Sequence, residues 1–540
     1  MIKALYRKSR WIHKYAGLIL VLFLMWMSIS GIILNHPQLF APISVPHALI
    51  PPTYKINNWN RSSLIGLVYS KQNPDVLYLY GKKGVWKSED GGKTFVPWQN
   101  GFPRSRYYLK TNHLFLWENE RPFLLAATDG GLYRAYLKEG RWHKVELPFK
   151  DEAVKKILFV RDRLLVFSES HVYGAPFPAN ELHFKTVPLK RAENRHSVTL
   201  VKLFFDLHDG QVWGLPGQLL VDVVGLILFF MSFSGFYIWF IPWRWRRRTK
   251  RNLKAIGYSK IRFIRWLVKY HLKIGIYVAF FFLILGSTAF FMRPPFLAVI
   301  ANGSVDASWY PGKISPNPWQ KKIQNALFDP QRDRLIIAAS DGLWQGDVRF
   351  SRPFEKVDFH VPIFVMGPTV FEYQNGNYLI GSFNGLFLFD ADSNSSRDVL
   401  TGQKVTTYSN IRPGEWMVTG YFKLSSGKQF LTTHDRGLWP LDGRQPSDRF
   451  AVPKQMNRDF TLSLWNYMFE LHNGRIFQDI IGDFYILIPP LGSFLFVLIT
   501  LTGIFDWIYI KLRHLKIAET TQKDYIEANT FEFESRREKE

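Results

Sequence analysis

Four histidines lie in two pairs of similar sequence segments. The segment LHDGQVWG at 207–214 recurs as LHNGRIFQ at 471–478, and in both copies a histidine precedes a glycine by two residues. The segments WIHKYAG at 11–17 and VKYHLKIG at 268–275 each place a histidine four residues before a glycine. A neutral imidazole is a common ligand of haem iron in helix bundles. This repeated pattern therefore predicts haem ligands supplied by two related halves of the chain.

The spacing between the copies indicates an internal duplication. His13 and His271 are 258 residues apart, and His208 and His472 are 264 residues apart. Haem iron in electron-transfer proteins takes two axial ligands. We therefore expect two haem groups, one bound by His13 and His271 and one by His208 and His472, at opposite faces of a membrane. The alternative is that each histidine is a polar residue at a membrane boundary and binds no iron.

Four uncharged apolar stretches are expected to position these histidines. They cover residues 16–34, 223–241, 274–292 and 484–505, and each is long enough to cross a bilayer. A cleaved signal peptide is a second interpretation of the first stretch, because a basic segment followed by an apolar one is also its signature. The three further stretches of similar length favour a membrane anchor.

Basic residues flank the apolar stretches on one side. Residues 1–15 carry five Lys/Arg and residues 242–265 carry ten, with no acidic residue in either segment. The positive-inside rule places these segments in the cytoplasm. Both termini would then be cytoplasmic, and the long segments 36–207 and 293–471 would lie in the periplasm of a bacterial inner-membrane protein. Much of the net charge of +25 thus lies beside the membrane spans, so we expect membrane lipids as partners and no nucleic acid.

The expected domain organisation follows from these boundaries. It comprises a cytoplasmic N-terminus and first span at 1–35, periplasmic β repeats at 36–207, a second span at 208–245, a basic cytoplasmic loop at 246–265, a third span at 266–292, further periplasmic β repeats at 293–471, a fourth span at 472–511 and a cytoplasmic tail at 512–540.

The two long segments between the spans contain a β repeat. Each copy is an apolar strand, a tight turn with glycine and a strand bearing an aromatic residue. Clear copies lie at 77–88, 124–135, 335–346, 378–389 and 430–441, with a weaker copy at 164–175. Three copies in each half predict one β-propeller assembled from both halves, since three blades alone cannot close a ring. The alternative is two separate small β domains. The segment SEDGGKTF at 88–95 resembles an Asp-box, which we interpret as a turn that stabilises the fold.

Other polar residues near the spans are candidates for secondary roles. His36 is a reserve iron ligand without a counterpart in the second half. Asp222, at the edge of the second span, would hydrogen-bond a ligand histidine, carry protons or reach the membrane surface. Arg10 and Arg293 are candidates for pairing with haem propionates at the two faces. The chain has no cysteine, which excludes disulfides, Cys-ligated iron–sulfur clusters and c-type haem.

At these residues the sequence resembles the PepSY-associated transmembrane family, which includes ferric-siderophore reductases and iron-regulated inner-membrane proteins. The resemblance rests on motifs around all four spans: Arg10-x-x-His13-x-x-x-Gly17, Ser30-Gly31, Leu207-His208-x-Gly210-x-x-x-Gly214, Ser234-Gly235 with Trp239, His271 with Gly275, His472 with Gly474, and Thr502-Gly503. Gln478 stands where the first half has Gly214, and β repeats occupy the place of a PepSY domain.

The resemblance implies haem b held by transmembrane histidines, and the two histidine pairs give the expected number of two per chain. It also implies electron transfer from a quinone or cytoplasmic donor to a periplasmic ferric chelate, such as a ferric-siderophore, or to a protein. The chain would then be a haem-dependent membrane oxidoreductase of the ferric reductase type.

Together these observations predict a fold class and a function. The fold class is a membrane bundle of four helices with internal duplication, joined to an all-β propeller-like domain built from both halves. The expected function is that of an inner-membrane b-type cytochrome that passes electrons to a periplasmic acceptor. The alternative is a redox-silent scaffold or sensor whose propeller binds a periplasmic partner. A transporter is disfavoured by the scarcity of charge within the spans.

Overall fold

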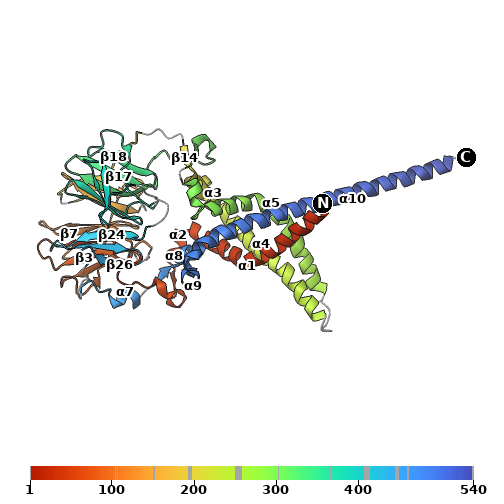
Figure 1. The fold of residues 1–540 in the computed structure, drawn as a ribbon, viewed down its shortest axis with the longest axis horizontal. Helices are drawn as coiled ribbons and strands as arrows, with labels where there is room; N and C mark the ends of the chain where they lie inside the picture. Colours follow the sequence, from red (N-terminus) through yellow and green to blue (C-terminus); the bar gives the residue numbers. More distant parts are fainter. Residues whose placement is uncertain are drawn as a thin grey trace. The chain divides into compact units, whose positions relative to one another are not determined.

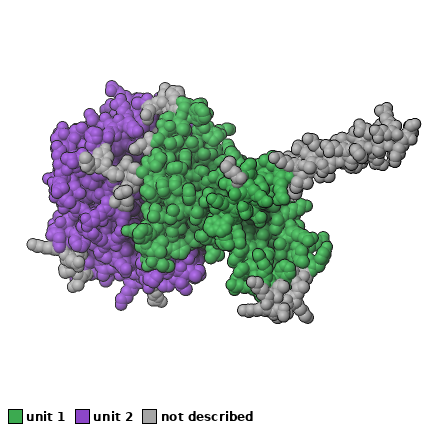
Figure 2. Space-filling model, turned by 45° about the vertical axis from the view of Figure 1, so that its right-hand side comes forward, with its two compact units in different colours: residues 1–37, 196–313, 468–540 green, residues 38–195, 314–467 purple. Residues whose placement is uncertain are grey.

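The computed structural model describes the chain except residues 1, 104, 106, 150–152, 180, 193–196, 250–257, 302, 365, 407–413, 444–448, 459–460 and 538–540. The middle of the predicted basic loop therefore lies outside the described residues. The chain forms two compact units (Figure 2). The helical unit contains residues 1–37, 196–313 and 468–540, and the β unit contains residues 38–195 and 314–467. Both units thus combine segments from the two halves of the sequence.

Four long helices form the core of the helical unit: α1 (Ile2–Asn35), α4 (Gly214–Thr249), α5 (Tyr258–Phe291) and α10 (Ile488–Arg537) (Figure 1). Each contains one of the apolar stretches and is long and apolar enough to cross a membrane. The last stretch starts before its long helix, because residues Gly482–Leu487 form the 3-10 helix η6. Pro489 and Pro490 lack a backbone N–H, and only the first turn of α10 accommodates them without loss of a helical hydrogen bond.

The four long helices pack as a bundle. Helix α1 contacts α4 and α10, and α5 contacts the same two helices, so α1 and α5 occupy opposite corners. Leu24, Leu228, Phe282 and Phe496 meet in the interior of the bundle. Gly286 allows α5 and α10 to approach closely, since a Cβ there would lie 2.8 Å from Val497. Close packing of small residues is the usual basis of helix association in lipid.

Short helices carry the repeated LHxG segments. Helix α3 (Leu200–Asp209) is capped by Thr199, whose side chain accepts a hydrogen bond from the Lys202 N–H. It ends at Gly210 in the left-handed region, with φ of 81°. Helix α8 (Leu464–His472) is likewise followed by Gly474, with φ of 74°. The glycine of each copy therefore ends the short helix, which leaves the histidine in the last helical turn.

The remaining short elements of this unit connect the helices. They are η3 (Gln211–Trp213), α6 (Leu297–Ile300), η4 (Ala307–Trp309), η5 (Arg475–Phe477), α9 (Gln478–Ile481) and the two-stranded pair β14 (Ser197–Thr199) and β15 (Ser304–Asp306).

Six antiparallel sheets form the β unit (Figure 1). We call their first strands the axial strands: β2 (Gly66–Tyr69), β6 (Thr111–Trp117), β10 (Val154–Val160), β16 (Ile323–Asp329), β20 (Val370–Gln374) and β24 (Val418–Lys423). Each axial strand contacts the next, and β24 contacts β2, which closes the ring. Three sheets precede α4 in the sequence and three follow α5. The prediction of one propeller built from both halves is confirmed, and the alternative of two separate β domains is wrong.

The outer strands of the blades complete five four-stranded sheets and one three-stranded sheet in the described chain. They are β3 (Leu77–Gly81), β4 (Gly84–Ser88), β5 (Val96–Pro97), β7 (Phe123–Thr128), β8 (Gly131–Tyr136), β9 (Trp142–Val145), β11 (Arg163–Ser168), β12 (Val172–Pro176), β13 (Lys185–Val187), β17 (Arg334–Ala339), β18 (Gly342–Asp347), β19 (Glu355–Val357), β21 (Asn377–Ser382), β22 (Gly385–Asp390), β23 (Ser395–Asp398), β25 (Gln429–Thr433) and β26 (Gly437–Pro440).

Smaller elements accompany the blades. They are α2 (Pro37–Phe40), η1 (His47–Leu49), η2 (Pro52–Tyr54), α7 (Lys454–Arg458) and the pair β1 (Ser44–Val45) and β27 (Leu462–Ser463).

The predicted repeat corresponds to the second and third strands of each blade. The weaker copy at 164–175 is a true copy, since it forms β11 and β12. In the five clear copies the turn glycine has positive φ, as at Gly84 (79°) and Gly131 (118°), which explains why glycine marks them. The axial strand lies outside the repeat and was not predicted. The Asp-box prediction is also consistent with its hydrogen bonds, because Asp90 accepts from the Thr94 side chain and from the Lys93 and Thr94 N–H groups.

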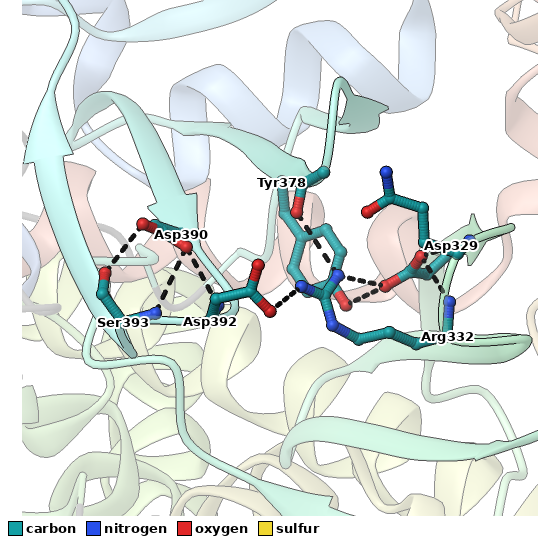
Figure 3. A network of polar contacts seen from close by, with 8 residues as sticks. Asp329, Arg332, Tyr378, Asp390, Asp392 and Ser393 are labelled. Atoms are coloured by element: carbon teal, nitrogen blue, oxygen red, sulfur yellow. Dashed lines mark hydrogen bonds and ion pairs between the residues drawn. The ribbon is translucent and has the colours of Figure 1, made fainter.

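A polar network joins two neighbouring blades. The buried carboxylate of Asp329 accepts hydrogen bonds from Arg332 (3.0 Å) and from the Tyr378 hydroxyl (2.7 Å). Figure 3 shows the Arg332 guanidinium between Asp329 and Asp392. Arg332 donates a second hydrogen bond to the Asp392 carboxylate. Because Asp329 ends β16 and Tyr378 lies on β21, these contacts fix one blade against the next.

Candidate functional site

His208 and His472 come together in the helical unit. Their ring centroids are 6.5 Å apart and their planes are inclined by 68°. His208 is in the last turn of α3 and His472 in the last turn of α8. The fold therefore brings together the two histidines that the repeated LHxG segments single out.

A hydroxyl group from a long helix holds each of these imidazoles. His208 Nδ1 lies 3.1 Å from Thr288 Oγ1 on α5, and His472 Nδ1 lies 2.8 Å from Ser30 Oγ on α1. Ser30 and Thr288 are 258 residues apart, the same offset that relates His13 to His271. The two halves thus use equivalent positions to orient equivalent histidines.

His13 and His271 are oriented in the same way at the other end of the bundle. His13 Nδ1 lies 2.8 Å from the Ile499 carbonyl and 3.3 Å from Thr502 Oγ1 on α10. His271 Nδ1 lies 2.8 Å from Ser234 Oγ on α4. The two imidazoles, on helices at opposite corners of the bundle, are close enough to interact electrostatically.

The hydrogen bonds identify the tautomer of these histidines. A carbonyl oxygen only accepts, so His13 Nδ1 must carry the proton that it shares with Ile499. The Ser30 hydroxyl donates its single proton to the Trp26 carbonyl at 2.7 Å, so it accepts from His472 Nδ1. Thr288 likewise donates to the Ile284 carbonyl at 2.7 Å. A proton on Nδ1 leaves the lone pair of a neutral imidazole on Nε2, so Nε2 is the atom that could bind a metal.

The glycines next to the hydroxyl residues make room for the imidazoles. A Cβ at Gly503 would lie 3.1 Å from His13 Cε1, and one at Gly235 would lie 3.3 Å from His271 Cε1. At Gly31 the distance to His472 Cε1 would be 3.8 Å. At Gly503 and Gly235 the missing side chain therefore admits the ring edge, whereas the 3.8 Å at Gly31 is an ordinary contact.

The residues of the His208/His472 pair fit a haem. The two imidazoles would hold a haem iron between them, because their rings lie 6.5 Å apart and their Nδ1 atoms are already hydrogen-bonded. No cluster of three or more His, Asp or Glu side chains in the described chain would bind a bare metal ion. Two histidines suffice only where a macrocycle supplies the other ligands.

An anion-binding group lies beside His472. Arg293 donates to the Asn473 carbonyl at 3.1 Å, and it interacts electrostatically with His472. The buried atoms Arg293 Nε and Asn473 Nδ2 have no hydrogen-bond partner in the described chain. Two unsatisfied donors next to the histidine pair fit a propionate carboxylate.

The other candidate residues have different environments. His36 Nε2 lies 2.6 Å from Asp222 Oδ2, and Asn35 donates to Asp222 Oδ1 at 2.9 Å. The structure thus pairs the reserve ligand with the candidate carboxylate and links α1 to α4. In the described chain neither residue forms a hydrogen bond with one of the four repeated histidines. Arg10 lies over the Tyr6 ring and interacts electrostatically with Asp506.

Two features of the site were missed in the sequence. The orienting roles of Ser30, Thr288 and Thr502 were not predicted, although a hydroxyl residue recurs near the end of each span. Asp506 was also missed. It interacts electrostatically with His13, and its Oδ1 atom is buried without a partner in the described chain. Its signal was a lone acidic residue directly after an apolar stretch.

A comparison with family models assigns the membrane-spanning part. The model described as "PepSY-associated TM region" matches residues 173–241 and 194–509. No curated protein matches the sequence significantly.

Comparison with solved structures finds several distant similarities. The extracellular domain of a one-component system from B. thetaiotaomicron has 12% identity and a TM-score of 0.33, with 73% of this chain and 40% of that chain covered. YCF48 from Cyanidioschyzon merolae has 11% identity and a TM-score of 0.30, with 71% and 96% covered. The Swd1 β-propeller domain from Myceliophteria thermophila has 10% identity and a TM-score of 0.28, with 72% and 97% covered. This chain thus spans less than half the length of the first of these proteins.

Proposed function

The chain belongs to the PepSY-associated TM family, and from this premise we propose that it is a b-type cytochrome of the bacterial inner membrane that transfers electrons to a periplasmic acceptor. The observation that carries the proposal is the geometry of His208 and His472. Their rings lie 6.5 Å apart, and hydroxyl groups on two different helices orient their Nδ1 atoms.

In this proposal the chain holds two haem b groups through four Nε2 atoms. His208 and His472 bind one group, and His13 and His271 bind the other. Each bound haem supplies reversible one-electron chemistry. The hydrogen bonds to Nδ1 fix the ring orientation and keep the lone pair on Nε2. Arg293 and Asn473 bind a propionate beside His472 and so exclude water from that edge of the site.

The spacing of the two sites suits transfer across a membrane. On α1, His13 and Ser30 are 17 residues apart, and on α5 the same separation relates His271 to Thr288. Seventeen residues of α-helix rise about 26 Å, which is most of the ~30 Å hydrocarbon core. The positive-inside rule assigns the His13/His271 pair to the cytoplasmic side. A quinone or a cytoplasmic protein would then be the donor, and a periplasmic ferric chelate, such as a ferric-siderophore, would be the acceptor.

Haem quantitation tests the proposal. Protein purified from haem-supplemented cells should show a Soret band and two haem b per chain by pyridine haemochrome assay. The double variant His208→Ala/His472→Ala should lose one haem, and His13→Ala/His271→Ala should lose the other. His183→Ala is the matched control, because His183 is exposed in the β unit and pairs only with Glu181 in the described chain. Protein without a Soret band, or with haem unaffected by both double variants, would contradict the proposal.

The redox-silent scaffold or sensor is the competing function. The scaffold hypothesis predicts that the histidine double variants retain full function in cells when their protein levels are normal. The cytochrome hypothesis predicts that the same variants lose their function. Oxidation of the reduced Soret spectrum on addition of a ferric chelate would identify the acceptor class.

A further inference from the structure

Ionisable side chains meet at the centre of the propeller. Lys156 lies on β10 and Glu372 on β20, and these two sheets are separated in the ring by the β16 sheet. The two side chains nevertheless interact electrostatically, and Glu372 also interacts with Tyr80 of the first blade. Sheets that are not neighbours face one another only across the axis of the ring. These side chains therefore gather where the axial strands converge.

The charges of this cluster are not satisfied within the protein. The Lys156 residue is only 7% exposed. In the described chain its ammonium group and the Glu372 carboxylate form no hydrogen bond or ion pair, with each other or with any other group. Burial lowers the pKa of Lys156 and raises that of Glu372, and the attraction between them only partly offsets these shifts. Lys156 is thus buried and Glu372 half-buried, and charges in such surroundings are unfavourable unless a ligand or ordered water compensates them.

Neutral polar atoms on axial strands also have no partner. His113 Nδ1 on β6 and Gln324 Oε1 on β16 are buried and make no hydrogen bond in the described chain. His113 lies next to the Tyr80 ring (centroids 6.2 Å apart), and it interacts electrostatically with Lys156. Native proteins rarely leave such atoms unsatisfied, so the unpartnered His113 Nδ1 beside Lys156 supports a binding site there.

Backbone irregularities aim these side chains. The register of β6 shifts between Thr111 and His113, and that of β10 shifts between Val154 and Lys156. A third shift in β16 falls at Gln324. A β-bulge leaves one residue unpaired and redirects the side chains beside it, and bulges are common next to functional sites. Three consecutive axial strands thus carry a bulge at the residues in question.

We propose that the centre of the propeller binds a small zwitterion of the amino-acid class, whose carboxylate pairs with Lys156 and whose ammonium group pairs with Glu372. A zwitterion compensates both buried charges, whereas an anion would leave Glu372 unpaired and a cation would leave Lys156 unpaired. His113, Gln324 and the Tyr80 hydroxyl supply the neutral hydrogen-bonding groups around it. This site is separate from the histidine pairs of the helical unit.

Thermal unfolding of the full chain in detergent tests the proposal. The probes are an equimolar pool of the twenty common L-amino acids, a pool of simple carboxylates and a pool of simple alkylamines. Only the amino acids should raise the Tm, because a ligand that binds the folded state alone stabilises it by mass action. Lys156→Met and Glu372→Gln should abolish the increase. Lys185→Met and Glu355→Gln, at exposed positions of the propeller, should retain it.

The same substitutions give a second readout that does not depend on the probe. Without ligand, the double variant Lys156→Met/Glu372→Gln should have a Tm equal to or above that of the wild type, since it removes both charges together and leaves neither uncompensated. No increase in Tm of the wild type with amino acids would overturn the proposal. An increase that persists in both variants, or an equal increase with carboxylates, would also overturn it. His208→Ala/His472→Ala should leave the increase in Tm with amino acids unchanged. Failure of the zwitterion proposal is therefore distinguishable from failure of the haem proposal.

Discussion

Ser30 and Thr288 hold a pair of histidines from equivalent positions in the two halves of the chain. Ser30 on α1 accepts from His472 Nδ1, and Thr288 on α5 accepts from His208 Nδ1. Both hydroxyls donate to a backbone carbonyl one turn earlier in their own helix. This arrangement fixes the orientation of each ring by a hydrogen bond that does not involve Nε2.

Removal of these hydroxyls should weaken haem binding at the His208/His472 site. Ser30→Ala and Thr288→Val leave the imidazoles without their Nδ1 partners, and loss of such a partner typically lowers metal affinity by about 10–100-fold. Haem titration of the purified variants would measure the change. Ser28→Ala is the control, because the Ser28 hydroxyl bonds only to the Leu24 carbonyl in the described chain. Equal affinity in Ser30→Ala and Ser28→Ala would refute the orienting role.

Replacement of the glycines beside the histidines by alanine should lower the haem content only where the new Cβ atom would crowd an imidazole. Gly503→Ala places a Cβ 3.1 Å from His13 Cε1 and should displace that imidazole, with loss of the haem of the His13/His271 pair. Gly31→Ala should be tolerated, because 3.8 Å is an ordinary contact. Gly17→Ala serves as the control, since nothing lies within 4 Å of its Cβ position. The haem-to-protein ratio after purification measures the effect, and a uniform result across the series would contradict it.

His36 should contribute to stability rather than to haem binding. Its bond to Asp222 is 2.6 Å long, and a hydrogen bond to a charged group contributes about 1.5–3 kcal/mol. His36→Ala and Asp222→Asn should therefore lower the Tm of the protein in detergent while two haem groups remain. Loss of one haem in His36→Ala alone would instead identify His36 as a ligand.

The Asp329 network should make the propeller sensitive to acid. Burial favours the protonated form of Asp329, but hydrogen bonds from Tyr378 and Arg332 outweigh it and hold its pKa below the ordinary value. A group whose pKa is lowered by folding stabilises the protein above its unfolded pKa of about 4, and this stabilisation is lost as the pH falls through the folded pKa. Asp329→Asn should thus be destabilised at neutral pH, by about 3–5 kcal/mol for the loss of a buried ion-pair partner.

Urea unfolding followed by tryptophan fluorescence, at several pH values between neutrality and 3, would measure this dependence. The difference between the wild type and Asp329→Asn should narrow as the pH falls. Asp358→Asn is the control, because Asp358 is 65% exposed and its contact with His360 is 3.4 Å long. A difference that does not vary with pH would show that the network acts through shape and not through charge.

Much of the architecture was predictable because it follows from local periodicity. Uncharged stretches long enough to cross a bilayer specify four helices whatever surrounds them. The turn glycines of the blade repeat were recognisable since only glycine readily adopts the positive φ required at Gly84 and its counterparts. The pairing of His208 with His472 was suggested by the duplicated LHxG segments, whose glycines end short helices.

The sequence by itself determined the four spans, the blades and the repeated histidines, because each depends on residues close together in the chain. Only the tertiary structure decided that Ser30 and Thr288 hold His472 and His208, that Asp222 pairs with His36, and that Lys156 and Glu372 interact electrostatically. These partners are separated by more than 75 residues, so no local pattern connects them. Their proximity arises from helix packing and from closure of the ring, which depend on the fold as a whole.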